Sequence, residues 1–303
     1  MGGVNLPLLL VNVVRQFLEV RVMGLSAEMT YYALLSVFPL IGALGAGLGF
    51  LERFIGPDAV ITAEAAILST LGTVFATEVT REVFVPLVQG LLREERAGFA
   101  LGSFLITILL ASRIFRSAIH TLDVAYRVEE RRGTVALWAR GFVFSLGAIV
   151  AGVVVLAMMV VGPLLGGGRA LADWLGLGVA FEVAWDVLRG PAAFLVATGF
   201  LAFLYRFGPN VRNRWWQTVP GAVFGSVGVV LVSIGFRAYL GVVGVDALGL
   251  VDAEGAVVVA ARVIGAGLAT LLWFWLAAMV LLTGGVLNAE ISRLRREMPP
   301  PQA

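Results

Sequence analysis

Six long stretches of the chain contain no charged residue, and this pattern predicts its secondary structure. A helix needs roughly 20 apolar residues to cross about 30 Å of hydrocarbon, and inside that helix every backbone polar group is paired. The stretches are close to this length, so they predict an all-α polytopic membrane protein, a single six-span domain over residues 1–303. The charge-free stretches are residues 29–51, 97–112, 141–168, 190–205, 215–236 and 263–289.

Segments outside these stretches have patterns of their own. In residues 1–24, charged residues interrupt Leu and Val, which predicts a short interfacial lead-in helix. Residues 52–96 alternate apolar and charged positions at helical spacing, so we expect an outer amphipathic helical segment between spans one and two. Pro39 lies within the first span and is expected to kink it. Residues 290–303 are predicted to form a cytoplasmic tail.

Composition agrees with a membrane protein and narrows the chemistry. With 59% hydrophobic and 14% charged residues, the chain is too apolar for a soluble domain. It has no Cys, which excludes disulfide and thiol chemistry, and His120 is its single histidine. No metalloprotease, serine-hydrolase, nucleotide-loop or zinc-ligand spacing occurs. We therefore expect no enzyme activity, no catalytic residue, no metal and no cofactor.

The arginines indicate an orientation. All 22 basic residues are Arg, and 14 of them fall on the inner side when the amino terminus is placed inside. Short inner loops are enriched in basic residues, so both termini are predicted to be cytoplasmic. The start of the chain lacks the pattern of a signal peptide, so we expect it to be retained. Arginines near anionic lipid explain the net charge of +2, and no nucleic-acid partner is required.

The most suggestive polar residues form a stripe at the end of the second span. Their spacing of 3, 4, 3 and 4 places them on one helix face about 21 Å long. Three interpretations remain open: arginines that extend to lipid phosphate, a site for an anionic headgroup or carboxylate, and an ion pair between helices. The residues of this stripe are Arg113, Arg116, His120, Asp123 and Arg127.

Depth within the membrane makes part of the stripe a candidate site. The charge-free run 97–112 has only 16 residues, so the span must extend beyond it. This places Arg113 and Arg116 below the inner headgroups, facing the bundle or a wet cavity. Glu28, near the start of the first span, is a candidate partner for these two arginines. Alternatively, it is an acid near a helix amino terminus, favoured by the helix dipole.

Short motifs also recur in a definite order along the chain. The first span carries small residues and then Tyr31-Tyr32, Ser36, Phe38 and Pro39. Later motifs are Ser112-Arg113 with the stretch to Tyr126, Tyr205-Arg206 with Pro209, Pro220-Gly221-Ala222, Phe236 with Tyr239, Trp273, and Leu287-Asn288-Ala289-Glu290. Together they resemble the YihY/BrkB family of bacterial inner-membrane proteins.

The resemblance implies a multi-pass fold of six helices in the bacterial inner membrane and a loose link to envelope integrity. For some relatives it implies movement of lipid precursors or anionic metabolites, and an old label calls the family a ribonuclease. This chain departs from the family at three positions. Val286 replaces a common Glu, Asp123 replaces a frequent Asn, and Ile264 replaces a common Tyr. A proton-coupled mechanism based on that Glu is therefore not expected here.

Two functions follow as hypotheses. The first is an inner-membrane transporter or flippase-like protein for an anionic amphiphile or small anion. Its partners would be membrane lipids and an anionic lipid or metabolite substrate, and a homo-oligomer is compatible with it. The alternative is a non-transporting scaffold protein of the cell envelope, in which the charges set topology only. A deep cavity at the arginine stripe would favour transport, and a fully packed bundle would favour a scaffold.

Overall fold

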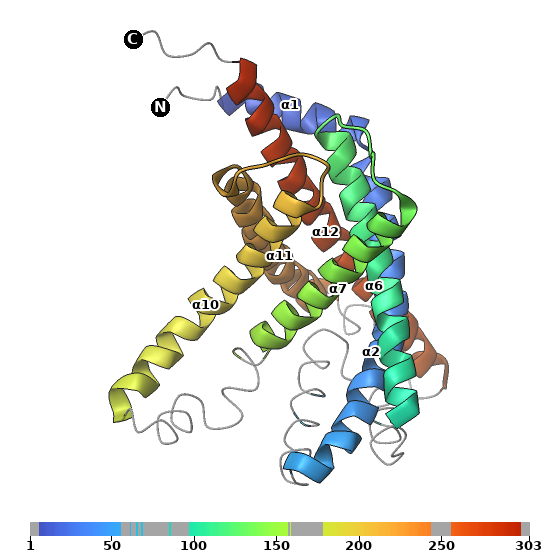
Figure 1. Cartoon of the computed structure of the whole chain (residues 1–303). Coiled ribbons are helices and arrows are strands. Elements are labelled where there is room, and N and C mark those ends of the chain that lie inside the picture. Colours follow the sequence, from blue (N-terminus) through green and yellow to red (C-terminus); the bar gives the residue numbers. More distant parts are fainter. Residues whose placement is uncertain are drawn as a thin grey trace.

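The computed structural model describes residues 6–55, 97–156, 178–243 and 256–297, with isolated positions at 61, 65, 68, 85 and 158. The described residues form helices joined by turns, and none of them lies in a strand (Figure 1). The helices are α1 (Leu6–Glu19), α2 (Val22–Ile55), α6 (Ala97–Ala125), α7 (Thr134–Leu156), α10 (Gly178–Phe207), α11 (Trp215–Val243) and α12 (Ala256–Glu297).

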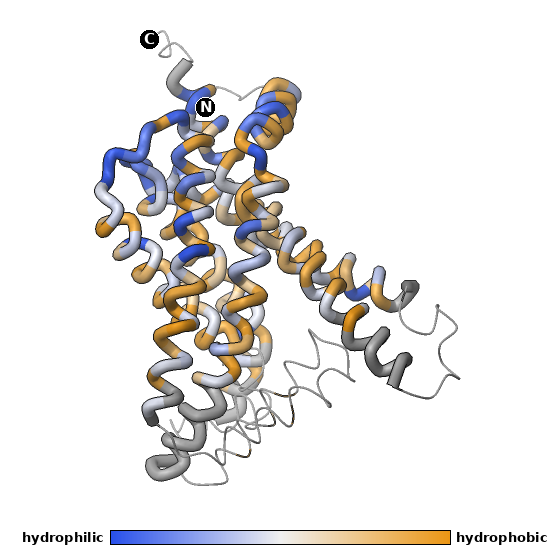
Figure 2. The backbone as a smooth tube through the Cα atoms, turned by 90° about the vertical axis from the view of Figure 1, so that its right-hand side faces the viewer, coloured by the Kyte–Doolittle hydropathy of each residue, from blue (hydrophilic) through white to orange (hydrophobic). Residues whose placement is uncertain are grey.

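Six of these helices are long and apolar enough to cross a membrane, which confirms the predicted fold class. Figure 2 shows apolar residues along the helices and hydrophilic residues gathered at the end where α1 and the last turns of α12 lie, which we call the terminal end. As expected, the second span continues beyond residue 112, to Ala125. The spans are Val22–Ala43, Leu101–Ala125, Thr134–Leu156, Val187–Phe207, Trp215–Leu240 and Gly267–Arg295.

Helix α1 lies across the terminal end, at a steep angle to the spans (Figure 1). Its outer face is apolar and exposed, with Leu10 at 58% and Val14 at 61% exposure, whereas Gln16 on the inner face is buried. Arg21 separates α1 from α2 and has a φ of 59°, a left-handed conformation that ends the first helix. An apolar outer face is what a helix lying in the membrane interface presents.

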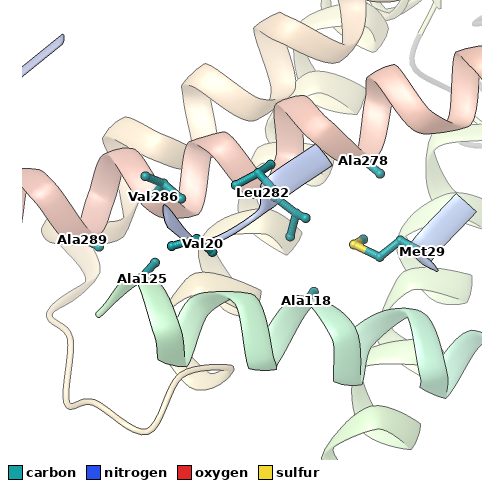
Figure 3. Close-up of a cluster of buried hydrophobic side chains, with 9 residues drawn as sticks. Val20, Met29, Ala118, Ala125, Ala278, Leu282, Val286 and Ala289 are labelled. Carbon is teal, nitrogen blue, oxygen red and sulfur yellow. The ribbon is translucent and has the colours of Figure 1, made fainter. Parts of the chain in front are cut away.

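Helix α6 lies between two apolar clusters. One face contributes Ala118 and Ala125 to a cluster with residues of α2 and α12, such as Met29 and Leu282 (Figure 3). Another face contributes Ile119 and Leu122 to a cluster with α7, α10 and α11. Because both faces are packed, the orientation of α6 about its axis is fixed, and with it the direction of its polar stripe.

Helices α11 and α12 are joined by a polar contact at two glycines. A Cβ atom on Gly221 would collide with the backbone carbonyl of Gly284, so only glycine allows this approach. The fully buried Asn288 accepts a hydrogen bond from the Gly221 N–H at 2.7 Å and donates one to the Thr218 carbonyl at 2.9 Å. Pro220, which lacks an N–H, lies between Thr218 and Gly221 in sequence and interrupts the helix ladder beside this contact.

Some predictions fall wholly or partly outside the described residues, and one that falls within them stays untested. Beyond Ile55, which ends α2, the predicted outer segment 52–96 is described only at isolated positions. Helix α12 continues past residue 290, so the start of the segment assigned to the cytoplasmic tail is helical up to Glu297. Pro39 lies inside an unbroken α2, and the kink expected there stays a prediction.

Candidate functional site

The predicted stripe on α6 spans two environments. At 100° per residue its five members occupy an arc of about 80°, wide enough to reach from a packed face to an open one. Asp123, at the packed edge of this arc, is 3% exposed, and Arg116 beside it is partly buried. Arg113, His120 and Arg127 are exposed. The stripe is therefore a boundary between the core and the surface of the bundle.

Two aromatic residues hold the first two arginines. The Arg113 Nη1 donates a hydrogen bond to the Tyr32 hydroxyl of α2 at 3.2 Å, and its guanidinium carbon lies 5.4 Å from the centre of that ring. The Arg116 guanidinium carbon lies 3.8 Å from the ring centre of Trp138, in the second turn of α7. The ring centre of Trp138 also lies 5.9 Å from the guanidinium carbon of Arg113. Each such contact contributes about 0.5–2 kcal/mol, so the two cations are fixed side by side between α2 and α7.

Most donors of these two cations are unused within the described part of the chain. A guanidinium has five N–H groups, and the hydrogen bond to Tyr32 uses one from Arg113. The Nε of Arg116 is buried and has no hydrogen-bond partner. No carboxylate of a described residue lies within 4.0 Å of either guanidinium. The pair can therefore bind the oxygens of an anion bidentately.

Glu28 is not an ion-pair partner of these arginines. It is exposed on α2, one turn before Tyr32, and lies farther than 4.0 Å from the nitrogens of Arg113 and Arg116. It still attracts Arg116 electrostatically at longer range. Glu28 is the seventh residue of α2, which begins at Val22, so it lies beyond the first turn. The helix dipole acts most strongly within that first turn.

The remaining members of the stripe have separate surroundings. The Asp123 Oδ1 accepts a hydrogen bond of 2.6 Å from the backbone N–H of Asn210, in the turn between α10 and α11. Arg127 follows the end of α6 with a φ of 55°, and its Nη2 lies 3.8 Å from the Glu19 Oε2 of α1. His120 is exposed and forms no hydrogen bond with another described residue. The structure therefore joins Arg113 and Arg116 into one site and leaves the other three outside it.

A polar centre that was not predicted as a site surrounds Glu290, the last residue of a motif that carries the family resemblance. This carboxylate is 1% exposed, and its Oε1 lies 3.3 Å from the Arg293 Nη1. Cavities of about 170 and 190 Å³ adjoin it, and both are lined by Glu290, Arg293 and Arg127. Gln16 of α1 lines the first cavity and donates a hydrogen bond to the Ala125 carbonyl. The centre thus connects α1 to the ends of α6 and α12.

Tyr32 and Trp138 were also missed as site residues. They lie 81 and 25 residues from Arg113 in sequence, so no local spacing connects them to it. Tyr32 belongs to a motif that the resemblance had singled out, and Trp138 is an aromatic residue near a span end, where such residues often mark the interface. Those two signals were available, but neither indicates an arginine partner.

Comparison with known proteins agrees with the membrane fold. YfkH of Bacillus subtilis (strain 168), whose name describes it as ribonuclease-like, is 23% identical over 274 residues, covering 90% of this chain and 91% of that protein. No solved structure matches the chain. The family described as virulence factor BrkB matches residues 13–303, which is nearly the whole chain. The chain is therefore a multi-pass membrane protein of the BrkB virulence factor family.

Proposed function

We propose that this protein is an inner-membrane transporter or flippase-like protein that handles an anionic amphiphile or a small anion and supports envelope integrity. The observation that carries the proposal is the pair of Arg113 and Arg116, fixed by Tyr32 and Trp138 with unused donors and no carboxylate of the described residues within 4.0 Å. Two adjacent, uncompensated guanidinium groups in a membrane span cost free energy, and an anion between them would offset that cost.

The distribution of arginines gives the proposal an orientation. With both termini in the cytoplasm, the inner side carries 14 of the 22 arginines. The terminal end then lies at the inner leaflet, and the arginine pair lies at the level where Trp138 would anchor near the headgroups. A lipid phosphate or a free anion from the cytoplasm could reach the pair from there. The inner leaflet is enriched in anionic lipids, and this enrichment favours a lipid headgroup as the ligand.

Ribonuclease activity, suggested for YfkH by its name, is not part of this proposal. His120 is the single histidine and the chain has no cysteine. Among the described residues, no three His, Asp or Glu side chains gather as metal ligands would. The described acids that are most buried, Asp123 and Glu290, face a backbone N–H and an arginine instead.

A scaffold is the second candidate, and the contact between α11 and α12 favours it. Asn288 and the paired glycines Gly221 and Gly284 close this interface tightly, as in a bundle built for rigidity. In addition, the two cavities beside Glu290 are lined by residues other than Arg113 and Arg116. Transport would then require these helices to separate, whereas a scaffold would not.

Reconstitution distinguishes the two functions. The full-length protein is placed in vesicles of phosphatidylcholine with a trace of fluorescent phosphatidylglycerol or fluorescent phosphatidylcholine, and dithionite bleaching reports translocation. A parallel set encloses a halide-sensitive dye. The proposal predicts faster movement of the anionic lipid or of halide than in protein-free vesicles, with the zwitterionic lipid slower than the anionic one. Protein-free rates for both lipids and for halide would leave the scaffold as the better account.

A further inference from the structure

A second group of arginines surrounds a cavity where the turn between α10 and α11 meets the start of α7. The cavity has a volume of about 370 Å³, within the range of small-ligand sites, roughly 300–1,000 Å³. Four of its lining residues are arginines from three parts of the chain, and we call it the arginine pocket. They are Arg132, Arg140, Arg206 and Arg212.

Part of this charge has a structural role. Arg132 donates hydrogen bonds to the carbonyls of Gly208 at 2.8 Å and Pro209 at 2.9 Å. Arg140 donates one to the Phe207 carbonyl at 2.5 Å. The Phe207 carbonyl belongs to the last residue of α10, and the other two carbonyls follow directly after it. The helix dipole favours cations at this end of a helix. Two of the four arginines therefore hold the turn in place and cannot be removed without risk to the fold.

The other two arginines have more donors to offer. Arg206 donates to the Asn213 carbonyl at 2.7 Å, but its Nε is buried and has no hydrogen-bond partner. Arg212 is exposed and forms no hydrogen bond or ion pair with another described residue. Both line the same cavity as Arg132 and Arg140. An anion in this cavity would therefore meet guanidinium groups whose N–H donors are not all used within the described residues.

Nearby acids of the described residues balance only part of the charge of the pocket. Glu130, whose Oε2 lies 3.5 Å from the Arg132 Nη1, is the one acid of the described residues within 4.0 Å of these four guanidinium groups. Glu130 and Asp123 act on Arg140 at longer range. Cations around one cavity repel each other, and an anion between them removes that repulsion.

Aromatic residues place the pocket near the membrane surface. The Arg206 guanidinium carbon lies 4.7 Å from the ring centre of Trp215 and 5.2 Å from that of Phe207. Both rings are about half exposed, and the neighbouring Trp216 is 82% exposed. Exposed Trp residues at span ends are typical of the lipid headgroup level. A ligand in the pocket could thus be a headgroup or a soluble anion.

We propose that the arginine pocket binds a phosphate group, carried by a lipid headgroup or by a soluble phosphate. Phosphate offers several acceptor oxygens and up to two negative charges, which matches planar guanidinium donors arriving from different directions. The site is separate from Arg113 and Arg116 and does not depend on the function proposed for them. It lies on the turn that joins α10 to α11, so occupancy would brace that turn against α7.

Binding to the full-length protein in detergent tests this proposal. Inorganic phosphate is titrated calorimetrically at low salt, and dioleoyl phosphatidylglycerol is compared with dioleoyl phosphatidylcholine by native mass spectrometry. Arg212→Gln removes one cation without removing a hydrogen bond of the described fold, and Arg206→Gln removes a second. The matched control is Arg214→Gln, in the same turn but outside the pocket lining.

Each pocket variant should weaken binding of the responding probe about tenfold, the effect of one charge-assisted hydrogen bond, and Arg214→Gln should change it less than about twofold. Binding of both probes would identify phosphate itself as the ligand, and binding of the lipid alone would identify a headgroup. If Arg206→Gln does not fold, Arg212→Gln decides alone. The proposal is overturned if neither probe binds or if the pocket variants bind with wild-type affinity. It is also overturned if Arg214→Gln loses as much affinity as they do. In a background that carries Arg113→Gln and Arg116→Gln, Arg212→Gln should still weaken the remaining binding about tenfold, because the two sites are separate.

Discussion

Replacing Asn288 with alanine should destabilise the contact between α11 and α12. The change removes two hydrogen bonds, to the Gly221 N–H at 2.7 Å and the Thr218 carbonyl at 2.9 Å, at a site that is fully buried. Side-chain hydrogen bonds in membrane bundles contribute on average about 0.6 kcal/mol and at most about 1.7 kcal/mol each. The two together, with the small cavity left behind, predict a loss of about 1–3 kcal/mol in the free energy of unfolding.

The measurement is unfolding by sodium dodecyl sulfate in mixed micelles, followed by tryptophan fluorescence and circular dichroism. Asn12→Ala is the matched control, since Asn12 is half-buried and forms no hydrogen bond with another described residue. It should change the unfolding free energy by less than about 0.5 kcal/mol. An Asn288→Ala protein as stable as the Asn12→Ala protein would show that the buried amide does not stabilise the contact between α11 and α12.

Three further predictions concern backbone geometry and topology. Gly221→Ala forces α11 away from the α12 backbone and should lower the free energy of unfolding by about 3 kcal/mol in the same assay. Gly235→Ala, with open space around its Cβ, should not lower it. Equal effects of the two variants would contradict the tight packing at Gly221. Arg127→Gly relieves a left-handed residue with a φ of 55° and should stabilise the protein by about 0.5–1 kcal/mol, so a loss of stability would contradict this. In a chain without native cysteine, an impermeant maleimide should label Ala65→Cys only from outside and Gln302→Cys only from the cytoplasm, and the reverse would overturn the orientation.

The spans could be predicted from the sequence because lipid imposes one strong requirement. Runs without charge identified all six helices, and even the extension of α6 beyond residue 112 followed from the length of the run before it. The placement of Arg113 and Arg116 on one helix face followed from helical periodicity. Run length and helical spacing depend only on residues that lie close together in the sequence, so one sequence is sufficient to infer them.

Contacts between distant helices could not be predicted in the same way. Glu28 was the natural partner for the arginines by charge, but Tyr32, one turn later, contacts Arg113. Asp123 was placed with the arginines of its stripe, but it accepts a hydrogen bond from Asn210, 87 residues away. Which residue faces which depends on the rotation of each helix, and that is set by packing of apolar side chains on both faces of α6. The rotation of each helix about its axis cannot be predicted from one sequence alone.

The central claim is that Arg113 and Arg116 bind the anion that the protein moves, and one rate tests it most directly. The initial translocation rate of fluorescent phosphatidylglycerol is compared between wild-type vesicles and vesicles with equal amounts of the folded Arg113→Gln, Arg116→Gln double variant. Loss of two charge-assisted contacts predicts that the double variant translocates the lipid at least about tenfold more slowly than the wild type. Arg113→Lys keeps the charge but loses the planar guanidinium, so its rate should lie between those of the wild type and the double variant. A double variant that translocates the lipid at the wild-type rate would contradict the claim.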